Sequence, residues 1–533
     1  MQIARIGAGS TEQPGAEIVG AKAANLARVA ALGLPVPPAF VLPIELCAAI
    51  VNREPRTRQE LADGLAEGIE FLERATGRQF GDRRRPLLVS VRSGAARSMP
   101  GMLDTVLNVG CTPAATHGLI RMSGNPRFAL DCRRRFLENY GSVVLGVGSA
   151  VFRARLDEMT AAEAAAATER ALDGEALERL AASYQQAIED ENCVLADTPM
   201  EQLRAAAEAV YRSWMSDRAV TYRKLEHFED LRGTAVAVQA MVFGNSGASS
   251  GAGVAFSRDP STGDATPVID VMFESQGEDV VSGKYTPQTE EAIVRSLPAV
   301  AAQLRDALAR LEDEFGDVQD VEFTIETGKL WILQTRSTKR SPRAALRFAV
   351  DFVKRGRIAP AEALRRLSGI DLNKAATRRL VDAGQAVGQG TGACAGIGVG
   401  RAAFDADGAA RLAGNGDPII LIRPDTSTAD VAGFAISSGI VTAVGGRTAH
   451  AALVARQMDK PCIVGCAELA VDTEGRCARL PRTLLREGDW LSIDGGAGTI
   501  YLGRGTVVRD RPETELAEIE RWRNRALAGA APR

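Results

Sequence analysis

A histidine that follows two glycines and precedes an apolar stretch is the residue of this chain best placed for chemistry. His450 ends the segment Gly445–His450, and the apolar residues of Ala451–Arg456 after it have helical spacing. This order predicts a strand, a glycine turn and a helix whose first turn carries the imidazole. Unpaired N–H groups and the helix dipole favour an anion there, so a neutral imidazole suits nucleophilic attack and a phosphorylated one is stabilised. The alternative is a structural or surface histidine, but the other two, His117 and His227, lack this setting.

Two carboxylates at alternate positions form the second candidate for chemistry. The segment Asp317–Glu326 alternates like a strand, which places Asp320 and Glu322 on one face together with Thr324. Carboxylates spaced in this way suit Mg²⁺, which prefers hard oxygen ligands. An exposed strand face gives the same alternation and is the alternative explanation. Through a turn at 327–328, the next expected strand, 329–336, brings two more polar side chains alongside, Gln334 and Arg336.

Basic residues beside small ones mark candidate phosphate ligands in the first 105 residues. Lys22 follows Gly20 near the start of an expected helix that begins at residue 17, where a flexible point charge suits a phosphate. An ordinary surface lysine is the alternative. An expected strand at 86–91 leads into a loop at 92–105 that contains Arg92 and Arg97. Small residues let N–H groups approach phosphate oxygens and Arg adds bidentate pairing, although generic loops also contain glycine and serine.

A loop of glycine and serine, 244–253, lies between two expected strands, 234–243 and 254–257. Such a loop can cover bound phosphates as a flap, or it can be a plain flexible hairpin. The positions in it that suit phosphate contacts are Gly247, Ser249, Ser250 and Gly251. The loop lacks the Lys followed by Ser or Thr of a Walker A sequence, and the chain lacks the strand, G-x-G-x-x-G and helix of a dinucleotide fold.

The length and composition of the chain indicate the class of protein in which these residues lie. The chain has 533 residues, of which 45% are hydrophobic and 25% charged, as expected for a soluble globular protein of about three to four domains. The net charge of -3 gives no electrostatic case for binding nucleic acid or an anionic membrane. No apolar run reaches the roughly 18 residues of a membrane span, and the start is no secretory signal, so we expect a cytoplasmic protein.

The remaining composition predicts a glycine-rich and alanine-rich α/β protein with many tight turns. Its 8 cysteines are scattered and expected to be reduced, because no second pair or nearby histidine completes a zinc site around Cys462 and Cys466. Residues 127–225 are expected to be helical. Within them, the run Cys132–Arg135 is predicted to lie on a solvated face.

These motifs resemble, in their order along the chain, those of the pyruvate phosphate dikinase family. The similarity extends to about residue 505, and the segment Gly445–Arg456 looks like the family's phosphohistidine motif. The stretch 98–105 is more similar to this family than to the related water dikinases. The other segments that carry the resemblance are Lys22, 92–105, 244–253, 276–279, 319–323 and 333–336.

The resemblance implies an α/β multidomain fold, with an ATP-grasp nucleotide-binding module followed by a swivelling β/α phosphohistidine domain. It implies that ATP and Mg²⁺ bind, that the loop at 244–253 covers the phosphates, and that Glu322 and Gln334 hold the metal. His450 would attack the β-phosphoryl group of ATP, giving phosphohistidine and AMP, while orthophosphate takes the γ-phosphoryl group. The residues implied to contact the nucleotide are Lys22, Arg92, Glu278, Asp320, Glu322, Gln334 and Arg336.

The chain departs from the family pattern in two places. Ala449 stands where the family usually has serine, whereas Thr448 matches a family threonine and is a candidate regulatory position. The family normally continues into a C-terminal barrel that binds pyruvate or phosphoenolpyruvate, and this chain stops at residue 533. We therefore expect an acceptor bound outside the chain, either a separate protein or a small molecule, and a homodimer is possible.

The expected domains follow from these motifs. Residues 1–340 form the ATP-grasp module with a helical insert around 111–230, and 341–384 form a helical connector. Residues 385–505 form the phosphohistidine domain, and 506–533 a C-terminal tail. The main functional hypothesis is an ATP-dependent phosphotransferase. The alternatives are a non-catalytic nucleotide-binding or regulatory paralogue of a complete dikinase, and a generic ATP-grasp ligase that forms no phosphoenzyme.

Overall fold

The protein has a mixed α/β fold, as predicted. The computed structural model describes residues 2–97, 99, 101–163, 169–281, 285–425, 430–447 and 449–529. The chain divides into two compact units, the first made of residues 1–250 with 324–335 and the second of 251–323 with 336–533. The expected module 1–340 is thus shared between the units, because residues 251–323 pack with the later part of the chain. The predicted domain boundaries themselves remain predictions.

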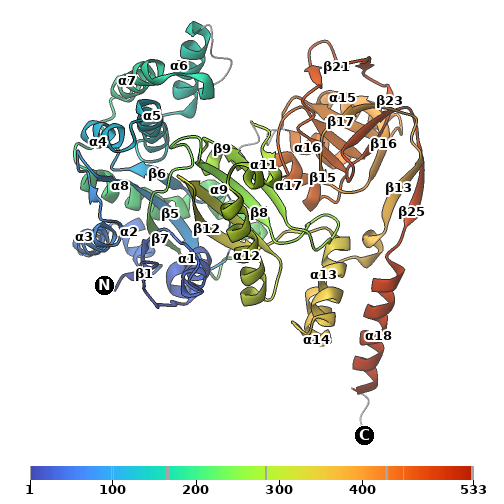
Figure 1. Ribbon diagram of the computed structural model, residues 1–533, viewed down its shortest axis with the longest axis horizontal. Helices are drawn as coiled ribbons and strands as arrows, with labels where there is room; N and C mark the ends of the chain where they lie inside the picture. Colours follow the sequence, from blue (N-terminus) through green and yellow to red (C-terminus); the bar gives the residue numbers. More distant parts are fainter. Residues whose placement is uncertain are drawn as a thin grey trace. The chain divides into compact units, whose positions relative to one another are not determined.

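The first unit is built on a sheet with the strand order β1-β2-β7-β5-β6 (Figure 1). All neighbouring strands in it are antiparallel. Its strands are β1 (Ala4–Ile6), β2 (Ala39–Leu42), β5 (Val89–Ala95), β6 (Thr105–Val109) and β7 (Thr234–Ala240), and the short strands β3 (Gln79–Phe80) and β4 (Pro86–Leu87) pair separately. The helices that precede β5 are α1 (Ala16–Ala31), α2 (Leu46–Val51) and α3 (Thr57–Thr76).

Alternation along the strands gives this sheet two different faces. In β7, Val236 and Val238 are fully buried in the main core, which also contains residues of α3 and α8 (Pro199–Arg212). Ala237 and Gln239 point to the opposite face, where α1 packs and a small cavity lies. One face therefore stabilises the unit, and the other carries polar side chains.

The region around 111–230, for which a helical insert was predicted, contains helices α4 to α9. Proline follows the N-cap residue at the starts of several helices, and Thr198 with Glu201 forms a complete capping box at the start of α8. The helices of this region besides α8 are α4 (Pro113–Ser123), α5 (Pro126–Val143), α6 (Ser149–Ala162), η1 (Glu169–Ala171), α7 (Gly174–Asp190), η2 (Ser213–Met215) and α9 (Asp217–Leu225).

The prediction that 132–135 forms a solvated face is wrong. Arg133 and Arg134 on α5 are only 6% and 3% exposed. Arg134 and Arg135 both pair with the buried carboxylate of Asp131, at 2.9 and 3.0 Å. These two guanidinium groups hold the pKa of Asp131 far below its usual value despite its burial. Asp131, Arg134 and Arg135 form a paired charge cluster in this helical region.

The second unit begins with strands of a sheet that has the order β10-β9-β8-β11-β12. Strands β11 and β12, joined by a tight turn at Thr327 and Gly328, were both predicted from the alternation. Each of them runs from one unit into the other along the chain. The elements of this part are β8 (Gly251–Phe256), β9 (Val268–Phe273), α10 (Gly277–Val281), β10 (Gln288–Thr289), α11 (Glu290–Ser296), α12 (Pro298–Phe315), β11 (Gln319–Glu326) and β12 (Lys329–Ser337).

A second sheet of this unit, with the order β14-β24-β23-β16-β17-β18-β19-β15, carries the predicted histidine motif. Its strand β18 (Gly439–Thr442) is followed by the glycine turn and then by α17 (His450–Gln457), as the sequence predicts. The other elements are β14 (Gln385–Gln389), β15 (Thr391–Cys394), β16 (Ile397–Ala403), α15 (Ala406–Gly414), β17 (Ile419–Arg423), α16 (Val431–Ile436), β19 (Cys462–Val464), β23 (Trp490–Asp494) and β24 (Thr499–Leu502), with a separate sheet of β20 (Ala470–Asp472), β21 (Cys477–Leu480) and β22 (Thr483–Arg486).

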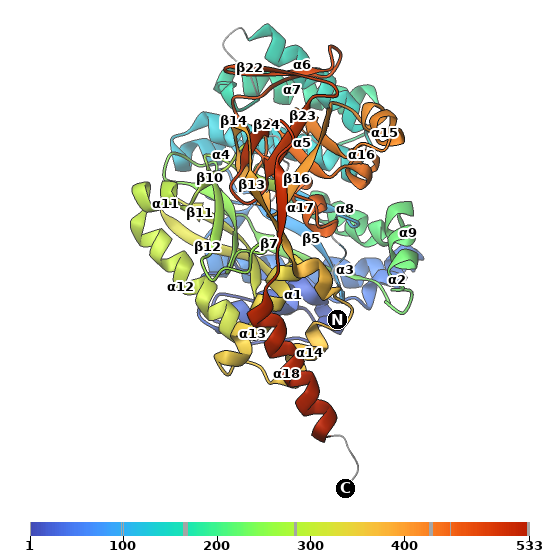
Figure 2. The ribbon, with the colours of Figure 1, turned by 90° about the vertical axis from the view of Figure 1, so that its right-hand side faces the viewer.

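The expected connector and C-terminal tail pack against each other. Strand β13 (Thr377–Asp382) pairs antiparallel with β25 (Thr506–Asp510), and the two lie side by side in Figure 2. Buried Leu346 and Val350 of α13 form one core with Ile519 and Trp522 of the tail. The helices of this region are α13 (Pro342–Lys354), α14 (Pro360–Arg366), η3 (Leu372–Ala375) and α18 (Glu513–Gly529).

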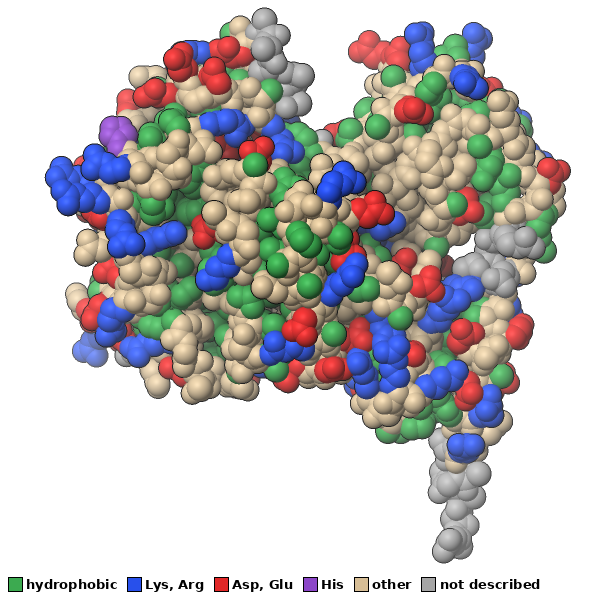
Figure 3. All heavy atoms as spheres, viewed as in Figure 1, with side chains coloured by type: hydrophobic (Ala, Val, Ile, Leu, Met, Phe, Trp, Pro, Cys, Tyr) green, Lys and Arg blue, Asp and Glu red, His purple; other side chains and the backbone are tan. Residues whose placement is uncertain are grey.

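In Figure 3, basic and acidic side chains are interspersed on the visible face, and basic side chains gather at its left edge and in its lower right part. In the described parts of the chain, no helix combines the length and apolar character needed to span a membrane. All eight cysteines are free thiols.

We expect Gly20→Ala to destabilise the first unit far more than Gly33→Ala. Gly20 has φ 80° and ψ 155°, a region that is essentially restricted to glycine, and an added Cβ would lie 2.1 Å from the carbonyl oxygen of Gly94. Gly33 also has a positive φ of 73°, but an added Cβ meets nothing within 4 Å.

Thermal unfolding of both variants measures the difference. Strain at a positive φ costs about 1–2 kcal/mol, and overpacking adds about 1–3 kcal/mol. Only Gly20→Ala should show both effects. Equal midpoints for the two variants would contradict a close contact between α1 and β5.

Candidate functional site

Three of the predicted nucleotide contacts line one cavity in the first unit. Lys22 from α1, Arg92 from β5 and Gln334 from β12 meet there, although they are far apart in the sequence. The rest of the lining is largely apolar, including Val19 and Leu26. Two cations beside an apolar wall form a suitable environment for a nucleotide, which has an anionic end and an aromatic end.

The break in α1 explains how Lys22 reaches this cavity. Gly20 leaves the helical conformation, and its close approach to Gly94 brings α1 against β5. Lys22 therefore lies in the first turn of the helix that resumes after the break. The amide of Asn25 then donates to the carbonyl oxygen of Thr335 at 3.2 Å, which ties the same helix to β12.

Arg92 lies in a strand, which differs from the predicted loop. Strand β5 continues to Ala95, and Arg92 is paired in register with Thr105 and with Ala237. Its guanidinium donates to the side-chain oxygen of Gln239 at 3.4 Å. Sequence reasoning missed Gln239, although a glutamine within an otherwise apolar strand was a signal for it.

The loop after Arg92 is held by ion pairs on its own unit. Arg97 pairs with Asp230 at 3.1 Å and lies over the ring of Phe228. Arg218 pairs with Asp104 farther along. Ser98 and Pro100, which belong to the predicted phosphate loop, lie outside the described residues.

The glycine-rich loop does not close a hairpin, because β7 and β8 belong to different sheets. Ser250 is buried, its hydroxyl accepts from the N–H of Thr327 at 2.9 Å, and it shares a 2.8 Å hydrogen bond with Ser246. Ser249 is exposed, and its carbonyl oxygen accepts from the N–H of Gly328 at 2.9 Å. The tip of the loop is therefore fastened to the turn between β11 and β12.

Two further features fix the shape of this loop. Gly247 has a φ of 150°, and an added Cβ at Gly251 would lie 2.9 Å from the carbonyl oxygen of Met272. The buried amide of Asn245 donates to Asp131 at 2.9 Å. The charge cluster of the helical insert thus anchors the start of the loop, a role that the sequence did not reveal.

The acidic pair lies in the second unit, with the predicted arginine beside it. Asp320 is 6% exposed, and one of its carboxylate oxygens accepts from Arg336 at 2.8 Å. Burial raises the pKa of Asp320, and this effect outweighs the opposing influence of Arg336, while the nearby carboxylate of Glu322 raises the pKa further. Glu322 is half-buried on the same strand.

The donor set at this position fits a divalent cation. The other oxygen of Asp320, Oδ1, is buried and accepts no hydrogen bond. Among the residues that the structure describes, no group of three or more His, Cys, Asp or Glu side chains is arranged to hold a metal. Mg²⁺ usually binds one or two carboxylates and completes its shell with water and phosphate oxygens, so a carboxylate pair is sufficient. Gln334, the other predicted metal ligand, belongs to the first unit.

The turn before His450 packs against strand β9 and the residues before β10. An added Cβ at Gly446 would lie 2.2 Å from Pro287 and 3.2 Å from Oδ2 of Asp270. Gly465 similarly approaches Thr286. His450 is the first residue of α17, and its side chain and the whole of Thr448 lie outside what the structure describes.

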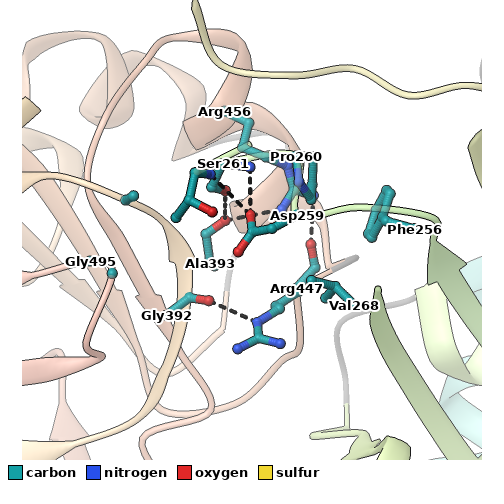
Figure 4. A pocket seen from close by; sticks show the side chains of 13 residues that line it. Phe256, Asp259, Pro260, Ser261, Val268, Gly392, Ala393, Arg447, Arg456 and Gly495 are labelled. Carbon is teal, nitrogen blue, oxygen red and sulfur yellow. Dashed lines mark hydrogen bonds between the residues drawn. The ribbon is translucent and has the colours of Figure 1, made fainter. Parts of the chain in front are cut away.

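Arg456, six residues after His450, is the second residue that the sequence did not reveal. It is 5% exposed, and its guanidinium donates to the carbonyl oxygens of Ala393 at 3.0 Å and Arg447 at 2.5 Å (Figure 4). Burial lowers the pKa of Arg456, and the carboxylates of Asp320 and Asp270 act in the opposite direction. The guanidinium of Arg456 therefore holds the loop before the histidine against the end of β15.

Figure 4 also shows how the neighbouring loop is held. Arg447 donates to the carbonyl oxygen of Gly392 at 3.0 Å, and the hydroxyl of Ser261 donates to that of Ala393 at 3.2 Å. Glu278, the last predicted contact, is exposed on the short helix α10. The structure thus groups Lys22, Arg92 and Gln334 in one unit, and the carboxylate pair, Arg336 and the histidine turn in the other.

Two models of known protein families match this chain. A model of the pyruvate phosphate dikinase AMP/ATP-binding domain matches residues 53–301 and 290–355. A model of the mobile domain of PEP-utilising enzymes matches residues 415–498, which contain the histidine turn and α17.

Several curated proteins are similar over nearly the whole chain. Pyruvate, phosphate dikinase of Clostridium symbiosum is 40% identical over 494 residues, which are 91% of this chain and 56% of that protein. The Rhizobium meliloti (strain 1021) protein of the same name is 39% identical over 524 residues, 95% of this chain and 58% of its own length. Pyruvate, phosphate dikinase 1, chloroplastic, of Arabidopsis thaliana is 37% identical over 510 residues, 95% of this chain and 53% of its own length. The chain spans a little over half the length of these relatives, and because the nucleotide-binding model alone matches more than half of it, the protein belongs to the pyruvate phosphate dikinase family.

Proposed function

We propose that this chain is an ATP-dependent phosphotransferase that forms a phosphohistidine at His450. The imidazole nitrogen attacks the β-phosphorus of ATP, the bond to the α-phosphate breaks and AMP leaves. Orthophosphate then accepts the γ-phosphoryl group, the two leave together as pyrophosphate, and the β-phosphoryl group stays on His450. The observation that carries this proposal is the packing of the histidine turn beside Asp270, in the unit that also holds Asp320 and Glu322.

The other predicted residues take roles that their chemistry supports. Lys22, Arg92 and Arg336 neutralise the charge of the phosphates, since phosphoryl transfer depends mainly on positioning and charge stabilisation. Asp320, Glu322 and Gln334 hold Mg²⁺, and Glu278 contacts the same nucleotide. When bound, the metal supplies positive charge to the phosphate oxygens. Gly247, Ser249, Ser250 and Gly251 cover the phosphates, and Thr448 is a regulatory position.

The final acceptor is bound outside this chain in our proposal. The names of the relatives point to pyruvate as the small molecule and orthophosphate as the second phosphate acceptor. A separate acceptor protein would serve equally in the second half-reaction. A cytoplasmic homodimer is the assembly we propose.

Phosphoenzyme formation tests the central step. Incubated with Mg²⁺ and ATP labelled at the β-phosphate, the protein should acquire acid-labile label, and more rapidly with orthophosphate. His450→Ala should acquire none, because it lacks the nucleophile. The matched control is His117→Ala, since His117 is exposed on α4 and should label like the wild type.

Each result has a defined meaning. Label in both histidine variants would place the phosphoryl group on another residue. Binding of ATP without label in the wild type would instead support the non-catalytic regulatory paralogue. ATP-dependent ligation without label would support the generic ATP-grasp ligase.

Asp320→Asn should lower activity while raising stability at neutral pH. The raised pKa means that folding disfavours the ionised carboxylate, so the wild type loses stability as pH rises from about 4, the unfolded pKa, through the folded pKa. The amide cannot ionise, so its advantage should appear at neutral pH and vanish at acidic pH. Labelling should fall about tenfold or more, because one of the carboxylates proposed to hold Mg²⁺ beside the phosphates is lost.

Thermal unfolding between acidic and neutral pH, without metal or nucleotide, measures the stability effect. Asp306→Asn is the control, since its side chain is 67% exposed on α12. A lower midpoint for Asp320→Asn at neutral pH would mean that the pair with Arg336 outweighs the penalty of burial.

Ser250→Ala should loosen the glycine-rich loop, whereas Ser249→Ala should not. The first change removes the acceptor of the Thr327 N–H, at a cost of about 0.5–1.5 kcal/mol. We expect a lower unfolding midpoint and a several-fold higher KM for ATP. Ser249 contributes its backbone carbonyl to the turn, which the substitution retains. Equal unfolding midpoints would contradict the anchoring role of Ser250.

A further inference from the structure

The second unit contains a large cavity that the proposed reaction does not use. Its volume is about 600 Å³, which is within the range of small-molecule sites. Three parts of the unit form its walls. Ser341 and Arg343 come from the start of α13, Arg509 from β25, and Ser438 and Lys460 from the sheet that carries the histidine motif.

The lining has an excess of positive charge. Arg343, Lys460 and Arg509 contribute three cations, and Asp459 is the one carboxylate among the lining residues. Walls of low dielectric constant concentrate the electric field of these cations, which raises the local concentration of anions in the cavity. The cavity therefore selects for negatively charged molecules.

One of these cations, Lys460, is buried at some electrostatic cost. Burial lowers the pKa of Lys460, whose ammonium donates to the carbonyl oxygens of Ala435, at 2.8 Å, and Ser437. An ammonium has three donors, so one remains for a ligand, and an anion there would stabilise the charged form of Lys460. Arg343 lies in the first turn of α13, where the helix dipole adds positive charge and Ser341 is the N-cap.

Arg509 adds a cation with no role in the fold. Its side chain is exposed, and within the part of the chain that the structure describes it has neither a hydrogen bond nor an ion pair through its guanidinium. A guanidinium offers a planar pair of donors that matches a carboxylate or a phosphate. It is therefore free to meet a ligand at the edge of the cavity.

We propose that this cavity is a binding site for a small organic dianion, either a phosphate monoester or a dicarboxylate. The volume greatly exceeds that of a bare inorganic ion, and cations on different walls suit two negative charges on one molecule. Because α13 and β25 lie outside the predicted phosphohistidine domain and Lys460 lies within it, a bound dianion links these segments. Binding itself does not depend on the proposed phosphotransfer.

Isothermal titration of the 533-residue chain tests the site, with glycerol 3-phosphate, malate and orthophosphate as probes. We expect saturable binding of at least one organic dianion that weakens with salt and exceeds the affinity for orthophosphate. Arg509→Gln should weaken it about tenfold or more, since a charge-assisted contact is lost. This variant is the primary one because an exposed side chain is not needed for folding. Lys460→Gln is the second.

Two controls separate this site from the nucleotide site. Arg482→Gln removes an exposed arginine from the turn between β21 and β22 and should bind like the wild type. Lys22→Ala should also bind normally, even if it abolishes phosphoenzyme formation. The proposal is overturned by no saturable binding of either organic probe, by equal affinity in the wild type and both cavity variants, or by an affinity for orthophosphate that matches theirs.

Discussion

The guanidinium of Arg456 joins the parts of the structure on which the proposed chemistry depends. A charge this deeply buried is costly unless it is paired or hydrogen-bonded. Here two carbonyl oxygens, those of Ala393 and Arg447, accept from it, and the ring of Phe256 lies 5.5 Å away. The same interaction fixes the loop before His450, the end of β15 and the helix that the histidine begins. Burial lowers the pKa of Arg456, and Asp320 on strand β11 is among the groups that act in the opposite direction.

Strands β11 and β12 carry four of the other predicted site residues, and these residues fall in both units of the chain. Along β12, Gln334 belongs to the first unit and Arg336, two residues later, to the second. Residues at this spacing share one face of a strand. Lys22 and Arg92 supply cations in the first unit, whereas Asp320 and Glu322 supply carboxylates in the second. Among the predicted residues, the first unit therefore supplies cations, and the second supplies carboxylates together with Arg336.

The sequence was informative where local pattern decides structure. Alternation predicted β11 and β12, and the glycines after β18 predicted the start of α17 at His450. It failed where a partner far along the chain decides burial. The run at 132–135 was predicted to be a solvated face. Asp131 is a local partner of Arg134 and Arg135, three and four residues away, but its bond to Asn245, 114 residues away, leaves no local pattern. Asp270 and Arg456 also gave no local signal, whereas Gln239 stood out as a glutamine in an apolar strand. The side chain of His450 and all of Thr448 lie outside the described residues, so their proposed roles remain predictions.

The burial of Asp320 is not explained by a contribution to the stability of the fold. Its Oδ1 has no hydrogen-bond partner, and burial raises its pKa although Arg336 is 2.8 Å from the other oxygen. A protein selected only for stability would replace such a group with an apolar or fully bonded residue. Its presence on a buried strand beside Glu322 is consistent with the divalent cation that we propose for this position, because a cation would give Oδ1 the partner that it lacks. In that proposal, part of the cost of burying the carboxylate is offset only when the cation is bound.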